Sequence, residues 1–215
     1  KVDVRRAAAD AVGESGGDSV GPLCAALRDD DANVRVDAVV ALSKIVREAS
    51  SAVPALIDVL ENDVENVRFM AAEALGNIGP SAEVAVPALT KALKDTDIQV
   101  RAAAAKSLGR IGRVAVPALV ATLRDPDARV RRRAVAALGT IGPEARDAVP
   151  WLIECLKDEA LSPQAADALR AIGRDARAAV PALLEAMKDE KGDVSRLASD
   201  ALGTIGAEAV PGMQV

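Results

Sequence analysis

The stretch VPALTKALKDTDIQVRAAAAKSLGRIG, residues 86–112, decides the fold. Apolar residues recur at i, i+3 and i+7 in its first part, and its proline suits a first helical turn, whose N–H groups have no partner within the helix. These features predict a first helix from Val86 to Asp95, closed by a short polar turn. A second helix is predicted from about Ile98 to Ile111, and Gly112 then stands where a helix C-terminus favours a left-handed residue. The stretch therefore predicts two helices joined by a tight turn.

Three phrases of this stretch recur along the chain at spacings of about thirty residues, which is the signature of a repeat architecture. The VPAL phrase and its relatives carry Pro22, Pro54, Pro87, Pro117, Pro150, Pro181 and Pro211. The VR pair and the closing LGxIG phrase recur between these prolines, and the glycines inside LGxIG are Gly76, Gly109, Gly139 and Gly203. A glycine inside a helix costs about 1 kcal/mol against alanine. Its recurrence at one register predicts that a neighbouring helix approaches closely there.

The pattern predicts an all-α protein, an α-solenoid of about six complete helix pairs after a leading half repeat. We expect a single array over residues 1–215, with a half repeat at 1–16, repeats at 21–48, 52–79, 84–112, 114–142, 147–173 and 178–206, and a terminal stub at 207–215. Solenoids usually carry polar caps on their end repeats, and the N-terminal end has no obvious one. We therefore expect truncation there, from a larger chain or assembly, or a partner packed on that end.

The consensus VPALxxALKDxDxxVRxxAAxALGxIG resembles the HEAT-like repeats of the phycobilisome-lyase type over nearly the whole chain. The resemblance implies a solenoid whose second helices line a concave surface. It implies no single function, because the family includes chromophore lyases, large scaffolds, hydroxylases and DNA glycosylases. The hydroxylases of the family bind iron through histidine, and this chain has no histidine.

Composition argues against catalysis. The absence of histidine excludes Ser-His-Asp and Cys-His arrangements and every histidine metal site. Cys24 and Cys155 fall in first helices four repeats apart, too far for a disulfide, and are interpreted as small core residues. Carboxylates are scattered, and there is no glycine-rich phosphate loop. We expect no enzyme activity, no cofactor and no metal. No apolar run reaches the length of a membrane span and no signal peptide is visible, which favours a cytoplasmic protein.

Aspartates precede the recurring arginines by four residues, or by five at Asp63. The sequence predicts a structural ladder in which each aspartate caps a helix and pairs with arginine along the stack, as the family resemblance also implies. Its members are Asp31, Arg35, Asp63, Arg68, Asp97, Arg101, Asp127 and Arg131. The ladder lapses in the last two repeats, where Ser162 and Ser195 replace arginine. Ser162 is followed by Pro163, which predicts an N-cap and a first-turn proline.

The middle of the chain is basic, although the whole chain has a net charge of −5. Between Ile98 and Arg133 lie nine Lys or Arg and two Asp, while both flanks are acidic. Helical geometry turns several of these cations outward on second helices. The resulting patch would suit an acidic partner or a phosphate backbone, but a solvated face whose charges are balanced by neighbouring turns is the favoured interpretation.

Two aromatic residues stand at unusual positions. Phe69 is on the outward face of its second helix, where it could anchor a partner or fold over a neighbouring repeat. Trp151 is on a first helix, where packing is the favoured interpretation. The concave face is expected to present Arg6, Asp10, Lys44, Phe69, Glu73, Lys106, Arg110, Arg132, Asp167 and Arg196. The candidate partner-binding residues are Phe69, Glu73, Lys106, Arg110, Arg131, Arg132 and Arg196.

Three functions remain open on these grounds. The leading hypothesis is a non-enzymatic scaffold that binds another protein, one with an acidic or extended segment, on the concave face. A bilin lyase-type subunit acting with a partner chain is the second, and it rests on resemblance alone. Nucleic-acid binding through the basic middle is the third. It is disfavoured because stacking aromatics are nearly absent and the acidic flanks would repel phosphate.

Overall fold

The computed structural model describes residues 19–45, 49–188 and 193–206. Throughout these ranges the chain is helical and folds as an α-solenoid of helix pairs, so the predicted all-α solenoid is confirmed. The predicted half repeat at 1–16, with Arg6 and Asp10, and the stub at 207–215 lie outside the described residues. The single-array organisation of residues 1–215 stays a prediction.

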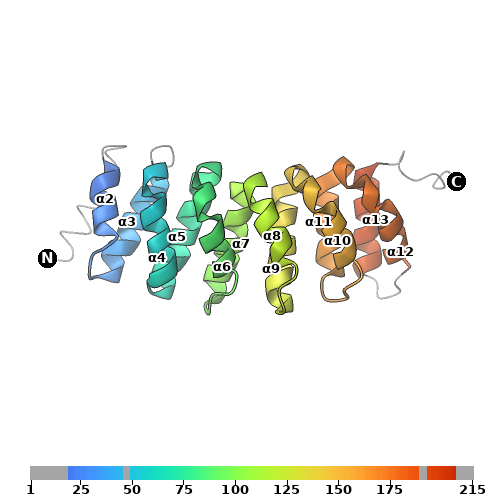
Figure 1. Cartoon of the computed structure of the whole chain (residues 1–215), viewed down its shortest axis with the longest axis horizontal. Helices are drawn as coiled ribbons and strands as arrows, with labels where there is room; N and C mark the ends of the chain where they lie inside the picture. Colours follow the sequence, from blue (N-terminus) through green and yellow to red (C-terminus); the bar gives the residue numbers. More distant parts are fainter. Residues whose placement is uncertain (1–18, 46–48, 189–192, 207–215) are drawn as a thin grey trace. The chain divides into compact units, whose positions relative to one another are not determined.

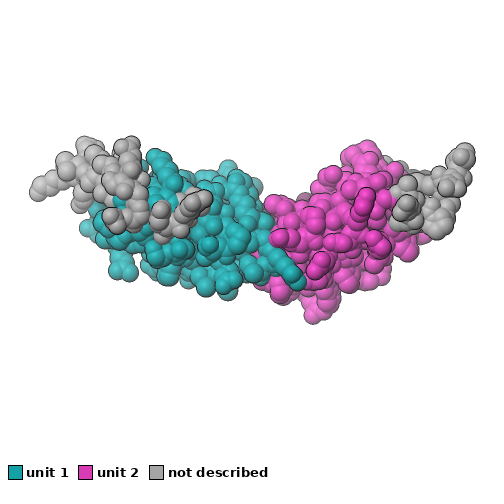
Figure 2. Space-filling model, turned by 90° about the horizontal axis from the view of Figure 1, so that it is seen from above, with its two compact units in different colours: residues 1–114 teal, residues 115–215 magenta. Residues whose placement is uncertain are grey.

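The chain divides into two compact units, residues 1–114 and 115–215, each described by itself (Figure 2). The helices of unit 1 are α2 (Val20–Ala26), α3 (Ala32–Lys44), α4 (Val53–Asn62), α5 (Glu65–Ile78), α6 (Val86–Ala92) and α7 (Ile98–Ile111). The helices of unit 2 are α8 (Val116–Thr122), α9 (Ala128–Ile141), α10 (Val149–Cys155), α11 (Ser162–Ile172), α12 (Val180–Ala186) and α13 (Asp193–Ile205). Short 3₁₀ helices lead into later first helices: η2 (Ala49–Ala52), η3 (Gly79–Ala85), η4 (Arg113–Ala115), η5 (Gly142–Ala148) and η6 (Gly173–Ala179).

Each unit has two layers. In unit 1 the first helices α2, α4 and α6 lie in front of the second helices α3, α5 and α7 (Figure 1). In unit 2 the first helices are α8, α10 and α12, and the second helices α9, α11 and α13 pack on one another in order. We call α3, α5 and α7, and α9, α11 and α13, the second-helix layer of the respective unit.

Local sequence signals set the helix ends. The VPAL proline falls in the first turn of α4, α6, α8, α10 and α12, as predicted. The closing glycine takes a positive φ, for example 84° at Gly112. Two predicted ends were wrong. The helix predicted to reach Asp95 ends at Ala92, because its last turn tightens into i→i+3 hydrogen bonds such as Lys94 N–H to Lys91 O. Ser162 is the first residue of α11 rather than its N-cap, which is Leu161, because the Ser162 N–H already donates to Asp158 O.

Small residues set the spacing of the second-helix layer. Gly76 of α5 faces Ser107 of α7, whose buried hydroxyl donates to Ala72 O at 2.8 Å. Gly139 of α9 faces Ala168 of α11, at 3.3 Å from the position of an added Cβ to Ala168 Cα. The predicted close approach is confirmed at these two glycines, whereas an added Cβ at Gly203 meets no atom of the described chain within 4 Å. Valine, leucine and alanine side chains fill the space between the layers.

Candidate partner-binding surface

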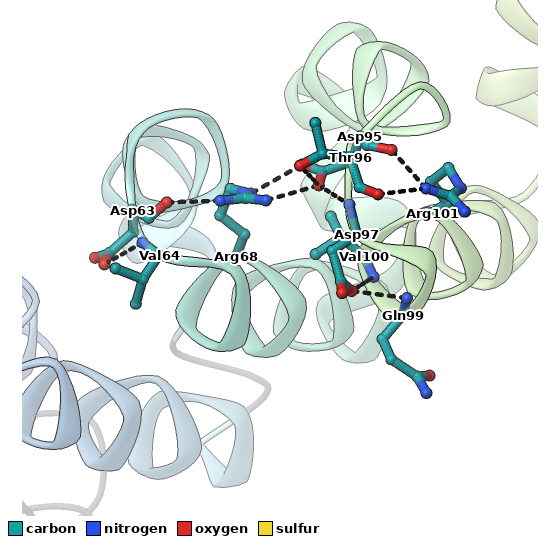
Figure 3. Close-up of polar contacts among 9 residues, drawn as sticks. All are labelled: Asp63, Val64, Arg68, Asp95, Thr96, Asp97, Gln99, Val100 and Arg101. Carbon is teal, nitrogen blue, oxygen red and sulfur yellow. Dashed lines mark hydrogen bonds and ion pairs between the residues drawn. The ribbon is translucent and has the colours of Figure 1, made fainter.

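A ladder of arginines ties each turn to the next one along the unit. The Arg35 guanidinium meets both carboxylate oxygens of Asp63, at 2.6 Å each. Arg68 holds Asp95 in the same two-bonded manner at 2.9 and 2.7 Å (Figure 3). In unit 2, Arg131 contacts Asp158 at 3.0 Å. Two parallel N–H···O bonds fix orientation as well as distance, so the Arg35–Asp63 and Arg68–Asp95 pairs set the spacing of successive repeats in unit 1. The Arg131–Asp158 contact in unit 2 is a single hydrogen bond.

The same arginines also brace the turn before their own helix. Arg68 Nη1 donates to Asp63 O at 2.8 Å, and Arg101 Nη1 donates to Asp95 O and Thr96 O at 2.8 and 2.7 Å (Figure 3). These carbonyl oxygens belong to the tight turn between the two helices of one repeat. The arginine therefore satisfies turn carbonyls that the helices leave without partners.

The sequence predicts that the same aspartate caps a helix and pairs with arginine, but in the structure different aspartates carry these two roles. Asp31, Asp97 and Asp127 cap the second helices by accepting backbone N–H bonds, for example from Gln99 at 2.8 Å (Figure 3). Asp95 and Asp158, which sequence reasoning missed as ladder members, receive the arginine of the preceding repeat. For Asp95 the signal was present in the Asp-x-Asp of the turn, whose first aspartate accepts the N–H two residues later, here from Asp97 at 2.8 Å. Asp158 accepts the N–H of Ala160 in the same way at 2.9 Å, but its turn has no second aspartate to mark it in the sequence.

The ladder changes the ionisation of its members. Hydrogen bonding to Asp95 raises the pKa of Arg68 above its ordinary value. Burial alone would raise the pKa of Asp95, but the hydrogen bonds from the Arg68 side chain and the Asp97 backbone outweigh it and the pKa falls below its ordinary value. Both side chains are largely buried. In the last repeat the serine replaces this arrangement, since Ser195 Oγ donates to Met187 O at 2.9 Å.

The second-helix layer of unit 1 brings four predicted partner-binding residues together. Glu73 of α5 lies 3.2 Å from Lys106 Nζ and 3.7 Å from Arg110 Nη1, both on α7. Arg110 also donates to Asn77 Oδ1 at 2.7 Å. Phe69, one turn before Glu73 on α5, is half-buried. Lys106 and Arg110 stay exposed, so their charges remain accessible although they are paired.

The second-helix layer of unit 2 separates the other three predicted residues. Arg131 is half-buried and engaged in the ladder. Arg132 is exposed and has no hydrogen bond or ion pair with the described residues. Arg196 on α13 pairs with Asp200 at 3.3 Å. The predicted basic window, Ile98–Arg133, falls partly in each unit. Among its members, some pair with Glu73, Arg131 joins the ladder, and Arg132 stays exposed without a partner in the described residues.

A groove of about 640 Å³ runs along the second-helix layer of unit 2. Its small-residue lining includes Ala136 and Gly139 of α9 and Ala171 of α11. Asp167 and Arg170 stand on its α11 side and pair with each other at 2.7 Å. The sequence interpretation placed Asp167 on this face but did not find the groove. A smaller groove of about 420 Å³ in unit 1 is lined by the ladder pair Arg68 and Asp95.

Other candidate groups have ordinary structural surroundings. Burial raises the pKa of the Cys24 and Cys155 thiols, which makes both poor nucleophiles at neutral pH. The described residues hold no group of acidic or cysteine side chains able to coordinate a metal ion. Within the same residues, every helix is too short or too polar to cross a membrane. Trp151 is partly exposed, with the Arg124 guanidinium 4.6 Å from its ring centroid.

Comparison with known proteins defines the family. The family model for HEAT repeats matches residues 1–63, 22–97 and 86–172. The chain belongs to the HEAT repeat family. This HEAT repeat protein is 30% identical to a chain in the complex of CpcE and CpcF of phycocyanin lyase from Nostoc sp. PCC7120, with a TM-score of 0.52 over 87% of this chain and 78% of that chain.

Two further solved structures resemble this HEAT repeat protein. An engineered protein is 27% identical, with a TM-score of 0.52 over 86% of this chain and 96% of that chain. The archaeal HEAT-like repeats protein from Thermococcus onnurineus NA1 is 15% identical, with a TM-score of 0.59 over 94% of each chain, and this likeness concerns the fold alone. No curated protein matches the sequence.

Proposed function

We propose that this HEAT repeat protein is a non-enzymatic scaffold that binds another protein through its second-helix layer. The observation that carries the proposal is the groove along α9, α11 and α13. Its volume is about 640 Å³, and residues of three successive second helices line it. The smaller groove of unit 1 is explained by the ladder that lines it, whereas the larger one has no such structural explanation.

Unit 1 supports the proposal through a different chemistry. Its second-helix layer offers a half-buried aromatic side chain, Phe69, beside the exposed cations Lys106 and Arg110. Interfaces concentrate binding energy in aromatic and arginine side chains, and rim charges steer the partner. We further propose that residues 1–215 form one array.

The test compares one substitution on the two layers. Ala102 on α7 and Ala136 on α9 are exposed on the second-helix layer, and Ala121 on α8 is exposed on the first-helix layer. Glutamate at any of these helical sites costs little stability. We expect affinity capture from an extract of the source organism to retain a defined partner with wild type and Ala121→Glu. At least one of Ala102→Glu, Ala136→Glu and the double variant should fail to retain the same partner. Equal retention by all variants would contradict the proposal.

A second candidate is a subunit of a bilin lyase that acts with a partner chain, supported by the 30% identity to a chain of the phycocyanin lyase complex. The test incubates this protein, with and without candidate partner chains, with apo-phycocyanin and bilin. A new long-wavelength absorbance band on the acceptor would support it, and an unchanged spectrum in every combination would remove it.

Nucleic acid is the weakest of the three candidates. Lys106 and Arg110 already pair with Glu73, and Arg131 pairs with Asp158. One Phe and one Trp leave little for base stacking. If the protein retains single-stranded DNA at low salt and charge reversal at Arg132 abolishes the retention, nucleic-acid binding would be favoured over the other two functions.

A further inference from the structure

The groove of unit 2 contains an amide oxygen that has no hydrogen-bond partner. Gln164, in the first turn of α11, lines the groove, and its Oε1 is buried without a donor within the described chain. Buried acceptors are nearly always paired, and each exception calls for an explanation. The torsion that sets a glutamine amide is soft, so the oxygen can turn into the groove when a donor is present there.

The floor of the groove permits the close approach of a main chain. Two of the residues that line it, Ala136 and Ala171, carry only a methyl group. The absent side chain of Gly139 makes room for Ala168 of α11 and not for an occupant. A helix satisfies its own backbone N–H groups and offers them only at its first turn. An extended segment instead offers an N–H group at every residue and needs no space for a helical cylinder of about 10 Å.

The charges around the groove favour an acidic occupant. Arg132 lies one turn before Ala136 on α9, on the same side of the helix, and is exposed without a partner in the described chain. Arg170 uses Nε and Nη2 on Asp167, which leaves its Nη1 free to bind a second carboxylate. Asp167 is the acidic residue that lines the groove, and Asp200 of α13 is near enough for its charge to act on Arg170. Both carboxylates are already paired, Asp167 with Arg170 and Asp200 with Arg196.

We propose that this groove holds an extended segment of the partner protein, with its carboxylate side chains on Arg132 and Arg170 and one of its backbone N–H groups donating to Gln164 Oε1. The inference rests on the proposed scaffold function and names the chemistry of the occupant.

The test titrates the ¹⁵N-labelled full chain with a capped twelve-residue peptide of alternating Asp and Ala, up to about 1 mM, a range that detects weak binding. We expect amide shifts to concentrate in α9 and α11. A peptide with Lys in place of Asp should cause no such shifts. A peptide methylated on its alanine nitrogens should bind at least tenfold more weakly. Six-nucleotide oligothymidylate, an anion without backbone N–H donors, should leave these amides unshifted.

Variants of the protein separate the groove from general charge effects. Gln164→Leu should weaken peptide binding at least tenfold while the far-UV circular dichroism stays unchanged, and Gln164→Met repeats the test if the first variant folds poorly. Gln99→Leu, at an exposed position of α7, is the matched control. Arg132→Glu should also weaken binding, whereas Arg28→Glu, at an exposed site in unit 1, should not.

Three results would each overturn the inference: shifts spread evenly over the chain, equal affinity for the methylated peptide, or full affinity of both Gln164 variants. Oligothymidylate that shifts the α9 and α11 amides as the acidic peptide does would also overturn it, in favour of charge alone. A further outcome is that partner capture depends on Ala102 or Ala136 while the peptide causes no shifts at the groove. That result would contradict the proposed extended segment in the groove but would leave the proposed scaffold function intact.

Discussion

Substituting Gly76 by alanine tests how closely the second helices pack in unit 1. An added Cβ would lie 2.3 Å from Ser107 Oγ and 2.9 Å from Ser107 Cα. Normal contacts between carbon atoms are about 3.5–4.0 Å. A new rotamer of Ser107 can move the hydroxyl but not the Cα atom, so α5 and α7 must separate.

The cost follows from three contributions. Overpacking a close contact costs about 1–3 kcal/mol. Separation also breaks the buried hydrogen bond from Ser107 to Ala72 O, which adds about 1–3 kcal/mol because it leaves polar groups without partners. Alanine returns about 1 kcal/mol through its helix propensity. We therefore expect Gly76→Ala to lower the free energy of unfolding by about 3 kcal/mol, or the melting temperature by about 6–12 °C.

Gly203 provides the matched control, because it stands at the same position of the repeat and an added Cβ there meets no described atom within 4 Å. Gly203→Ala should raise the free energy of unfolding by about 1 kcal/mol. Urea and thermal unfolding followed by circular dichroism measure both variants. If Gly76→Ala is as stable as wild type, or if both substitutions change stability in the same direction, the packing argument is refuted.

Three further predictions concern single residues. Asp95→Asn should lower the free energy of unfolding by about 1–3 kcal/mol at pH 7. Because the folded-state pKa of Asp95 is depressed, its contribution is present above the unfolded pKa of about 3.9 and is lost as the pH falls through the folded value. Urea melts should therefore show the difference from wild type shrinking in acid, and a constant difference would contradict this. Gln164→Met should raise the free energy of unfolding by about 1 kcal/mol, because it removes a buried acceptor that has no donor; a loss of stability in the same melts would mean that the amide is satisfied. The Cys155 thiol, whose pKa burial raises, should react with iodoacetamide at pH 8 much more slowly than a free cysteine and at the ordinary rate in urea, and equal rates in both conditions would contradict its burial.

The repeat spacing was sufficient to predict the helix pairs, since each phrase carries its own start and stop signals. Val86 begins α6, and α7 spans Ile98–Ile111, both as the sequence predicts. The interior glycines also indicated where helices approach. Their neighbours differ, however, because Ser107 faces Gly76 while Gly203 stands at the end of unit 2 without a facing atom in the described chain.

The site was harder to predict, because it depends on distances between repeats. Sequence spacing placed Asp97 near Arg101, but it could not show that Arg68 reaches forward to Asp95, since that contact depends on how far one turn lies from the next. The groove was missed for the same reason. Its lining combines residues of α9, α11 and α13, and spacing within one repeat cannot show which residues of different repeats meet. Gln164 follows Pro163 in the first turn of α11, where the sequence indicates a helix start and gives no sign of a binding site.

The central claim is that the second-helix layer binds a partner protein, and site-specific photo-crosslinking tests it most directly. A benzophenone amino acid is placed at Ala102 or Ala136 on the second-helix layer, or at Ala121 or Leu184 on the first-helix layer, all of which are exposed. Irradiation in an extract of the source organism should join one defined protein to the first two positions and to neither of the others. Crosslinks that form only from Ala121 and Leu184, or that form equally from all four positions, would contradict the claim.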